Sequence, residues 1–517
     1  MKRRAFLHHV SHSIAIPSLV GSFGLLAPKR LSSFLRLAAD TDKVLVLIYL
    51  QGGNDGLNTV VPLDQLSSLN IVRPQVVLPE SAILKLNGTQ VGLHPSLSGF
   101  RSLYQEGRLE IIQSVGYPQQ NYSHFRSNDI WMSGSDSTTY VNSGWTGRYL
   151  NHEHPDFPIG YPNTTVPDPL AIELGYGSSM LFQGPTANMS MVISNPNAFY
   201  QLVDNLEETA PDTDAGDKLR YIRLTARQSQ QYGQVVKQAA DKVTLQPGYD
   251  DNNSLAQQLK IVARLIAGGL QTSLYLVRLG GFDTHSTQVS AGDHTKGQHA
   301  MLLSHLNDAV ISFMNDLRYQ KVDDQVIGMT FSEFGRRITS NGSGGTDHGS
   351  ALPLFVFGNK VQGGVLGTNP VIPSNATNEN NLEMQFDFKQ VYTSILEQWF
   401  GVPEIDRENI LMNSFGSIPV IRDSSITGLS EKNDSKTFNV YPNPLSGMTT
   451  IEFISAGQAV SIEAIDVQGR KTADIFSGSL PVGKQVIPWN AGQLAAGRYF
   501  ILLHSAAGSQ AKSVVKW

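Results

Sequence analysis

The feature that most constrains the fold is a near-continuous apolar run, VLVLIYL, at residues 44–50. A strand of a parallel sheet reads this way when helices cover both of its faces. The run ends in QGGNDGLNT, a glycine-rich turn that carries Asn54 and Asp55. Ligands bind at the carboxyl ends of strands in open α/β sheets, so we expect this turn to form part of a site. Asn-Asp-Gly is also ordinary turn chemistry, which is the alternative.

Further apolar runs alternate with segments of helical periodicity through the middle of the chain, and this alternation predicts an α/β fold. Strands are expected at 109–115, 170–174, 190–193, 273–281 and 352–358, and helices at 92–108, 121–134, 217–243, 254–269, 299–317 and 384–401. Residues 135–215 are rich in Gly, Pro, Asn and Ser. We expect them to form long surface loops that cover the site.

The stretch 330–349, TFSEFGRRITSNGSGGTDHG, follows an apolar run and ends on Asp347 and His348 among glycines. Upstream, Asp283 and His285 are two residues apart, so in extended backbone their side chains share a face. Carboxylates beside imidazoles form oxygen and nitrogen sites for divalent metals. The chain has no cysteine, so thiolate ligands, disulfides and a cysteine nucleophile are excluded together. The alternative is that Asp347 and His348 only cap a loop.

Ser123 precedes a helical pattern just after the strand expected at 109–115. An N-cap is its simplest role. A hydroxyl at a helix N-terminus is also where a nucleophile facing an anion would lie. Arg126, close by, is a candidate to clamp the free oxygens of such an anion.

The two ends of the chain differ from the middle. Residues 1–40 have a basic start with Arg3 and Arg4, followed by an apolar segment too short and too interrupted to span a membrane. They resemble a twin-arginine export signal, and a basic amphipathic helix is the alternative. Residues 426–437 are a polar linker, and 438–517 hold seven short alternating runs that predict a small antiparallel β-sandwich. The net charge of −5 gives no reason to expect nucleic acid as a partner.

Four motifs in the region 41–425 carry a family resemblance. In order, they are YLQGGNDGLNTVVP, SHFRSNDIW, GGFDTHS and SEFGRR followed by GTDHG. With them the region resembles the bacterial family of unknown function DUF1501, which is itself similar to the alkaline-phosphatase-like superfamily of phosphatases and sulfatases. The resemblance implies an α/β/α sandwich and divalent metal ions, with Zn, Mg, Ca and Mn as candidates.

The resemblance also assigns roles to individual residues. Asp55, or Asn54 beside it, matches a ligand of the first metal, and Ser123 lies where the nucleophile would be. The remaining metal ligands that it implies are Asp283, His285, Asp347 and His348.

One departure from the superfamily pattern concerns the last histidine. Two-metal phosphatases bring a further histidine from later in the chain, yet none occurs here between His348 and His504. His504 belongs to the expected β-sandwich, so either His294 or His299 substitutes for the missing ligand or the second metal site is incomplete. We take His299 as the candidate.

The last 80 or so residues resemble the type A sorting domain of the type IX secretion system, through NVYPNPLSGMTTIEF and the closing GRYFILLHSAAGSQAKSVVKW. Together with the N-terminal signal, this implies passage through the twin-arginine translocase and the periplasm. The type IX machinery would then deliver the chain to the cell surface or the medium, with no transmembrane span in the mature protein.

We therefore expect a metal-dependent hydrolase of phosphate or sulfate esters with a serine nucleophile. The alternative is a non-catalytic surface protein on a degenerate hydrolase scaffold, because a fold does not fix a function. In that case residues 135–215 would bind a glycan or a protein.

Overall fold

The computed structural model of the chain describes residues 43–175, 177–193, 213, 231–422, 439–441, 445, 447–457, 459–466, 470–505 and 508–516. The expected twin-arginine segment lies outside these residues, as does the expected linker 426–437. Residues 1–422 and 423–517 form two compact units, which are described separately.

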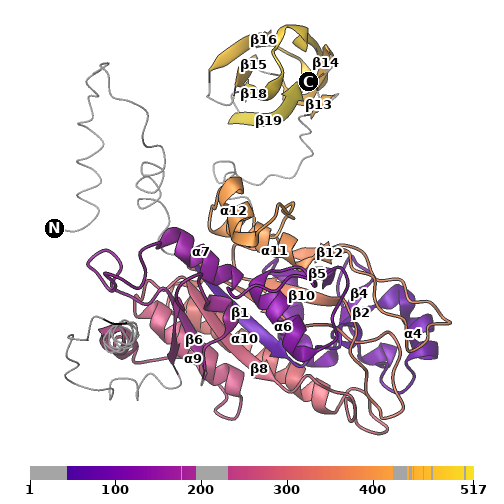
Figure 1. The fold of residues 1–517 in the computed structure, drawn as a ribbon. Coiled ribbons are helices and arrows are strands. Elements are labelled where there is room, and N and C mark those ends of the chain that lie inside the picture. Colours follow the sequence, from indigo (N-terminus) through magenta and orange to yellow (C-terminus); the bar gives the residue numbers. More distant parts are fainter. Residues whose placement is uncertain are drawn as a thin grey trace. The chain divides into compact units, whose positions relative to one another are not determined.

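The first unit is built on a mixed nine-stranded sheet (Figure 1). The strands run in the order β11-β5-β10-β9-β1-β8-β6-β7, and β12 also pairs with β5. Their bounds are β1 Val44–Gln51, β5 Leu109–Gly116, β6 Ala171–Leu174, β7 Ser190–Ile193, β8 Leu274–Gly280, β9 Val326–Phe331, β10 Leu352–Phe357, β11 Gly364–Leu366 and β12 Phe386–Asp387. The expected α/β/α sandwich is confirmed.

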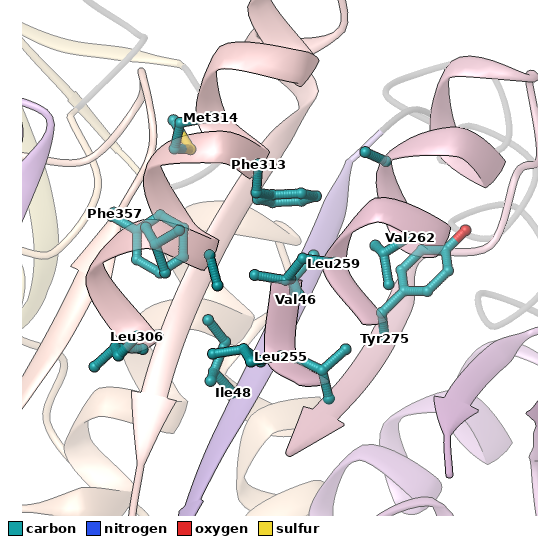
Figure 2. Packing of buried hydrophobic residues seen from close by; sticks show 14 of the residues in the cluster. Val46, Ile48, Leu255, Leu259, Val262, Tyr275, Leu306, Phe313, Met314 and Phe357 are labelled. Carbon is teal, nitrogen blue, oxygen red and sulfur yellow. The ribbon is translucent and has the colours of Figure 1, made fainter. Parts of the chain in front are cut away.

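The central strand β1 supplies both faces of the sheet by simple alternation. Val44, Val46 and Ile48 enter one apolar cluster, and Leu45 and Leu47 enter the other. On the first face lie α5 (Ser98–Gln105), α9 (Ser254–Ala267) and α10 (Gln298–Tyr319). Figure 2 shows this packing, in which side chains of α9 and α10 cover β1 and β8.

The opposite face is covered by α6 (His124–Ser133), α7 (Trp145–Glu153), α11 (Phe388–Ser394), the π-helix Ile395–Trp399 and α12 (Glu404–Leu411). A small sheet of β2 (Val60–Pro62), β3 (Leu84–Lys85) and β4 (Val91–Leu93) accompanies the short helices α3 (Gly56–Thr59) and α4 (Leu66–Val72). Among the described residues, no helix is both long and apolar enough to cross a membrane.

Three expectations about elements need correction. The loop region 135–215 contains a helix, α7, whose Trp145, Tyr149 and Leu150 are buried, so tertiary burial and not propensity determines this segment. The helix expected at 92–108 begins only at Ser98, because Val91–Leu93 pair as β4 and Pro95–Leu97 form a short 3-10 helix. The helix expected at 384–401 begins at Phe388, where Asp387 forms a capping box with Gln390.

The topology also gathers the loops of the site. β8 and β9 both pair with β1 in parallel, so the three strands end at one edge of the sheet. β5 is antiparallel to β10, and β10 is antiparallel to β9. β5 therefore runs in the same direction as β9 and ends at the same edge of the sheet. The segments that follow these strands are therefore brought together.

The second unit is all-β, as expected. It has one sheet of β13 (Asn439–Tyr441), β14 (Met448–Ala456) and β17 (Val482–Asn490). Its other sheet holds β15 (Ala459–Asp466), β16 (Lys471–Ser479), β18 (Gly497–Ser505) and β19 (Gly508–Lys516). A separate apolar cluster fills it, with Ile451, Ile462 and Ile501 among the most buried side chains.

Candidate metal centre

Three histidines and one aspartate converge at the edge where β1, β5, β8 and β9 end. Ligand atoms of His124, Asp283 and His348 all lie within 4.8 Å of one another. The Nε2 atom of His285 is 2.9 Å from Nε2 of His348 and 3.2 Å from Oδ1 of Asp283. His124 comes from the start of α6, and the others come from the loops after β8 and β9.

Each of these histidines is held through its other ring nitrogen. Nδ1 of His124 lies 2.8 Å from Oε1 of Glu333, and Nδ1 of His285 lies 2.9 Å from Oδ1 of Asp347. Nδ1 of His348 lies 2.8 Å from the carbonyl oxygen of Tyr122. An ionised carboxylate or a carbonyl can only accept, so each Nδ1 carries the proton and donates it. In the neutral rings, each Nε2 is therefore an unprotonated lone pair, a tautomer assigned from these acceptors.

The consequence is a set of lone pairs that face one another. Nε2 of His285, Nε2 of His348 and Oδ1 of Asp283 are separated by 2.9, 3.2 and 3.2 Å. Ligands placed tetrahedrally at about 2.0–2.1 Å from a metal ion lie about 3.3 Å from one another. Histidines whose Nδ1–H is fixed by a carboxylate or carbonyl are the usual form of metal ligand. The residues present thus fit a divalent cation.

A buried framework positions these ligands. Glu333 is 1% exposed, and its carboxylate also accepts from the backbone nitrogen of Gly52 at 2.9 and 3.1 Å. Arg336, also 1% exposed, donates from Nη2 to Oδ1 of Asp283 at 2.9 Å and from Nε to the carbonyl of Gly53 at 2.7 Å. Gly52 has φ +123°, and a Cβ there would lie 2.4 Å from the backbone nitrogen of Asp283, so only glycine fits.

The electrostatics of the centre favour ionised carboxylates. Burial alone would raise the pKa of Asp283, but the hydrogen bond from Arg336 and the charge of its guanidinium reverse this, and the pKa is lowered to about 2. A hydrogen bond from Asn341 is the main cause of the lowered pKa of Asp347. The hydrogen bond to Glu333 raises the pKa of His124, because the carboxylate stabilises the imidazolium.

The other predicted ligands form a second, fully buried cluster, which we call the inner cluster: Asn54, Asp55, Arg73, Gln288 and His299. Asp55 makes an ion pair with Arg73, and Nε2 of Gln288 donates to its Oδ2 at 2.5 Å. Nε2 of His299 lies 2.9 Å from Oδ1 of Asn54, and burial lowers the pKa of His299 to about 4. Burial opposes ionisation of Asp55, but the charge of Arg73 and the hydrogen bonds from Gln288 and Arg73 outweigh this effect and lower the pKa of Asp55.

The structure therefore separates the predicted metal ligands into two groups. The candidate metal centre contains Asp283, His285, Asp347 and His348. The inner cluster contains Asn54, Asp55 and His299. Gln288 links the two, because its Oε1 accepts from Oγ1 of Thr346 at 2.7 Å, one residue before Asp347.

Ser123 occupies the N-cap position of α6, but its side chain makes no capping hydrogen bond. It is exposed, and its backbone nitrogen donates to Oδ1 of Asn121 at 2.9 Å. Both of its neighbours take part in the centre, Tyr122 through its carbonyl and His124 through its ring. Ser123 thus lies on the rim of the candidate metal centre.

Arg126, the predicted anion clamp, contacts the loop that follows α6. Its Nη2 donates to the backbone carbonyls of Asp136, Ser137 and Thr139 at 3.2, 3.0 and 2.7 Å, and its guanidinium stacks on Tyr140. These contacts hold the loop after α6 and occupy Nη2 of the guanidinium.

Several residues of the site were not singled out from the sequence. His124 stands next to Ser123, and Glu333 and Arg336 lie inside the stretch 330–349, so position along the chain was a usable signal for these three. Arg73 had none. It is the residue that follows α4, in a segment without any motif.

Comparisons with known proteins place the chain as follows. The family described as protein of unknown function (DUF1501) matches residues 88–411, and the secretion system C-terminal sorting domain matches 439–516. No curated protein matches the sequence. The type IX sorting domain implies the secretion machinery as a partner and export to the cell surface or the extracellular space.

Solved structures give a further comparison. Alkaline phosphatase from the Antarctic bacterium TAB5 is 11% identical, covering 61% of this chain and 91% of that chain with a TM-score of 0.27. The PsFucS1 sulfatase from Pseudoalteromonas sp. is 10% identical, covering 90% and 89% with a TM-score of 0.34. PorZ of Porphyromonas gingivalis is 23% identical over 16% of this chain and 11% of its own length, with a TM-score of 0.13. Such values carry no information about activity, which has to come from the site itself.

Proposed function

From the premise that the chain belongs to the DUF1501 family, we propose that it is an exported hydrolase of phosphate or sulfate esters that depends on a divalent metal ion. One observation carries the proposal. Ligand atoms of His124, Asp283 and His348 lie within 4.8 Å of one another, Nε2 of His285 adjoins those of His348 and Asp283, and each imidazole is fixed through Nδ1 by an acceptor.

A divalent ion bound there would polarise the ester oxygens and lower the pKa of a hydroxyl group. The donor set is rich in nitrogen, which suits Zn²⁺ or a related transition metal. Mg²⁺ and Ca²⁺ prefer oxygen ligands and are less suited. His124, His285, His348 and Asp283 would hold the ion.

In this proposal Ser123 is the nucleophile. Its Oγ forms a bond to phosphorus or sulfur while the bond from that atom to the leaving oxygen breaks, and the hydroxyl proton ends on the released alcohol. Water then hydrolyses the serine ester and restores the hydroxyl. Arg337 takes the anion-clamping role, because its guanidinium lies 5.2 Å from the ring centroid of Tyr122 and its Nε donates to the carbonyl of His348 at 3.0 Å.

The test uses the full chain, stripped with a chelator and reloaded with Zn²⁺ or Mn²⁺. Bound metal is measured by elemental analysis, and turnover is measured with p-nitrophenyl phosphate and p-nitrophenyl sulfate. His285→Ala should lose both metal and turnover. His294→Ala is the matched control, since His294 is half-buried, contacts the carbonyl of Val77 and lies outside the centre.

Two results would overturn the proposal. One is a wild-type protein that retains no more metal than His285→Ala. The other is a metal-loaded protein that turns over neither ester, which would favour the surface-binding alternative.

A further inference from the structure

The inner cluster bears on how many metal ions the site uses. Resting on the proposed function, we infer that the centre works with one divalent ion. Arg73, fixed on Asp55, supplies the second positive charge where a second ion would otherwise sit.

Two oxygen ligands of the inner cluster, one on Asp55 and one on Asn54, are already engaged by protein donors. Oδ2 of Asp55 accepts from Arg73 and Gln288. Oδ1 of Asn54 accepts from Nε2 of His299 at 2.9 Å and from Oγ1 of Thr59 at 3.1 Å. A metal ion could use either of these two oxygens only by displacing the donors that hold it.

Charge gives the same answer. The side chains of Arg73 and Asp55 are 0% and 1% exposed, and the pair is formally neutral. A divalent ion beside that pair would leave two positive charges buried without compensation, which is strongly unfavourable. The residues of the inner cluster therefore do not fit a metal while Arg73 is in place.

The candidate metal centre, in contrast to the inner cluster, carries a negative formal charge. Three carboxylates contact its histidines or Arg336 directly, those of Asp283, Glu333 and Asp347, and Arg336 is the guanidinium paired with one of them. Arg337 contacts the carbonyl of His348 and none of these carboxylates, so it is left out of this count. With neutral histidines this leaves two formal negative charges, which one divalent ion neutralises. A second ion would bring an excess of positive charge to the same loops.

Four buried atoms of the inner cluster have no hydrogen-bond partner among the described residues: Oδ1 of Asp55, Nε and Nη1 of Arg73, and Nδ1 of His299. Two of these groups donate, and two accept. Such a mixture suits buried water, which offers both functions, and does not suit a bare cation facing the N–H groups of a guanidinium.

Arg73 is thus a positioning residue. Its ion pair fixes Asp55, Asp55 accepts from Gln288, and Gln288 accepts from Thr346 beside Asp347. Removing the guanidinium would leave the Asp55 carboxylate with Gln288 as a donor on Oδ2 and with Oδ1 unpartnered, so that the uncompensated carboxylate could take up a cation.

The experiment counts ions. The full chain, stripped of metal, is titrated with Zn²⁺ by calorimetry, and the bound metal is checked by elemental analysis. We expect one equivalent for the wild type, a second equivalent for Arg73→Ala, and one again for Asp55→Asn/Arg73→Ala. Circular dichroism establishes that each variant is folded.

The outcomes separate this inference from the proposed function. Two equivalents in the wild type, or one in folded Arg73→Ala, would overturn the role of Arg73 while leaving the hydrolase proposal intact. No bound Zn²⁺ in the wild type would instead overturn the proposed function. If Arg73→Ala fails to fold, Asp55→Asn decides, because it should keep its one equivalent, and loss of that equivalent would place a metal at Asp55.

Discussion

The contact between Glu333 and His124 is the most direct test of how the centre is assembled. Glu333→Gln keeps the shape of the side chain but removes its charge. One oxygen of the carboxylate accepts from Nδ1 of His124 at 2.8 Å and from the backbone nitrogen of Gly52 at 2.9 Å. The other accepts from Gly52 at 3.1 Å and from Oγ of Ser332 at 3.2 Å. In glutamine, an amide NH₂ group replaces one of these two oxygens, so a donor would face the backbone N–H of Gly52.

The magnitude follows from what is lost. A charge-assisted hydrogen bond is roughly twice as strong as a neutral one. Loss of a carboxylate that supports a metal-bound histidine typically weakens metal affinity by about 10–100-fold, or about 1.4–2.7 kcal/mol. We expect Glu333→Gln to fall in this range, near the upper end if the amide presents its nitrogen to His124. Because Glu333 raises the pKa of His124, the pH at which proton competition halves metal binding should also move downward.

The assay is a Zn²⁺ titration by calorimetry at several pH values, with the thermal unfolding of the metal-free protein as a check on folding. Glu110→Gln is the matched control, because Glu110 is also a buried glutamate of the same sheet, 3% exposed on β5, and contacts none of the metal ligands. An unchanged affinity in Glu333→Gln, or an equal loss in Glu110→Gln, would refute the reasoning.

Three further predictions concern other parts of the chain. Ser123→Ala should abolish ester turnover with metal affinity unchanged, and should cost less stability than the ~0.5–2 kcal/mol of a lost cap, since the hydroxyl makes no capping bond; full turnover would contradict the nucleophile. Burial raises the pKa of Glu110 from 4.5 to about 7, so the folded state holds a proton that the unfolded state has lost. The unfolding free energy should therefore fall by about 3 kcal/mol as pH rises from 4.5 to 7, and urea denaturation should show this fall in the wild type but not in Glu110→Gln. Deleting residues after 430 should leave the first unit folded but retained in the periplasm, and surface proteolysis of cells that still cleaves the truncated chain would contradict the sorting role.

Much of the fold follows from local pattern. The buried run at 44–50 became β1, the runs at 109–115 and 352–358 became β5 and β10, and the alternating segments after 438 became two small sheets. Helix α7 was missed, because its buried aromatic residues lie in a segment of loop-like composition. The side-chain periodicity of a helix or strand can be read from a sequence only where the regular element repeats the same pattern over several residues.

The sequence by itself determined which loops hold the candidate metal ligands, since Asp283, His285, Asp347 and His348 follow strands in recognisable motifs. Only the tertiary structure decided what each residue does there. Glu333 fixes the tautomer of His124 across a separation of 209 residues, and Gln288 reaches Asp55 across 233. Arg73 forms its ion pair with Asp55 from a segment that contains no motif. The physical reason is that protonation and ion pairing depend on distances of about 3 Å between side chains, and these distances are set by the packing of strands and helices far apart in the chain.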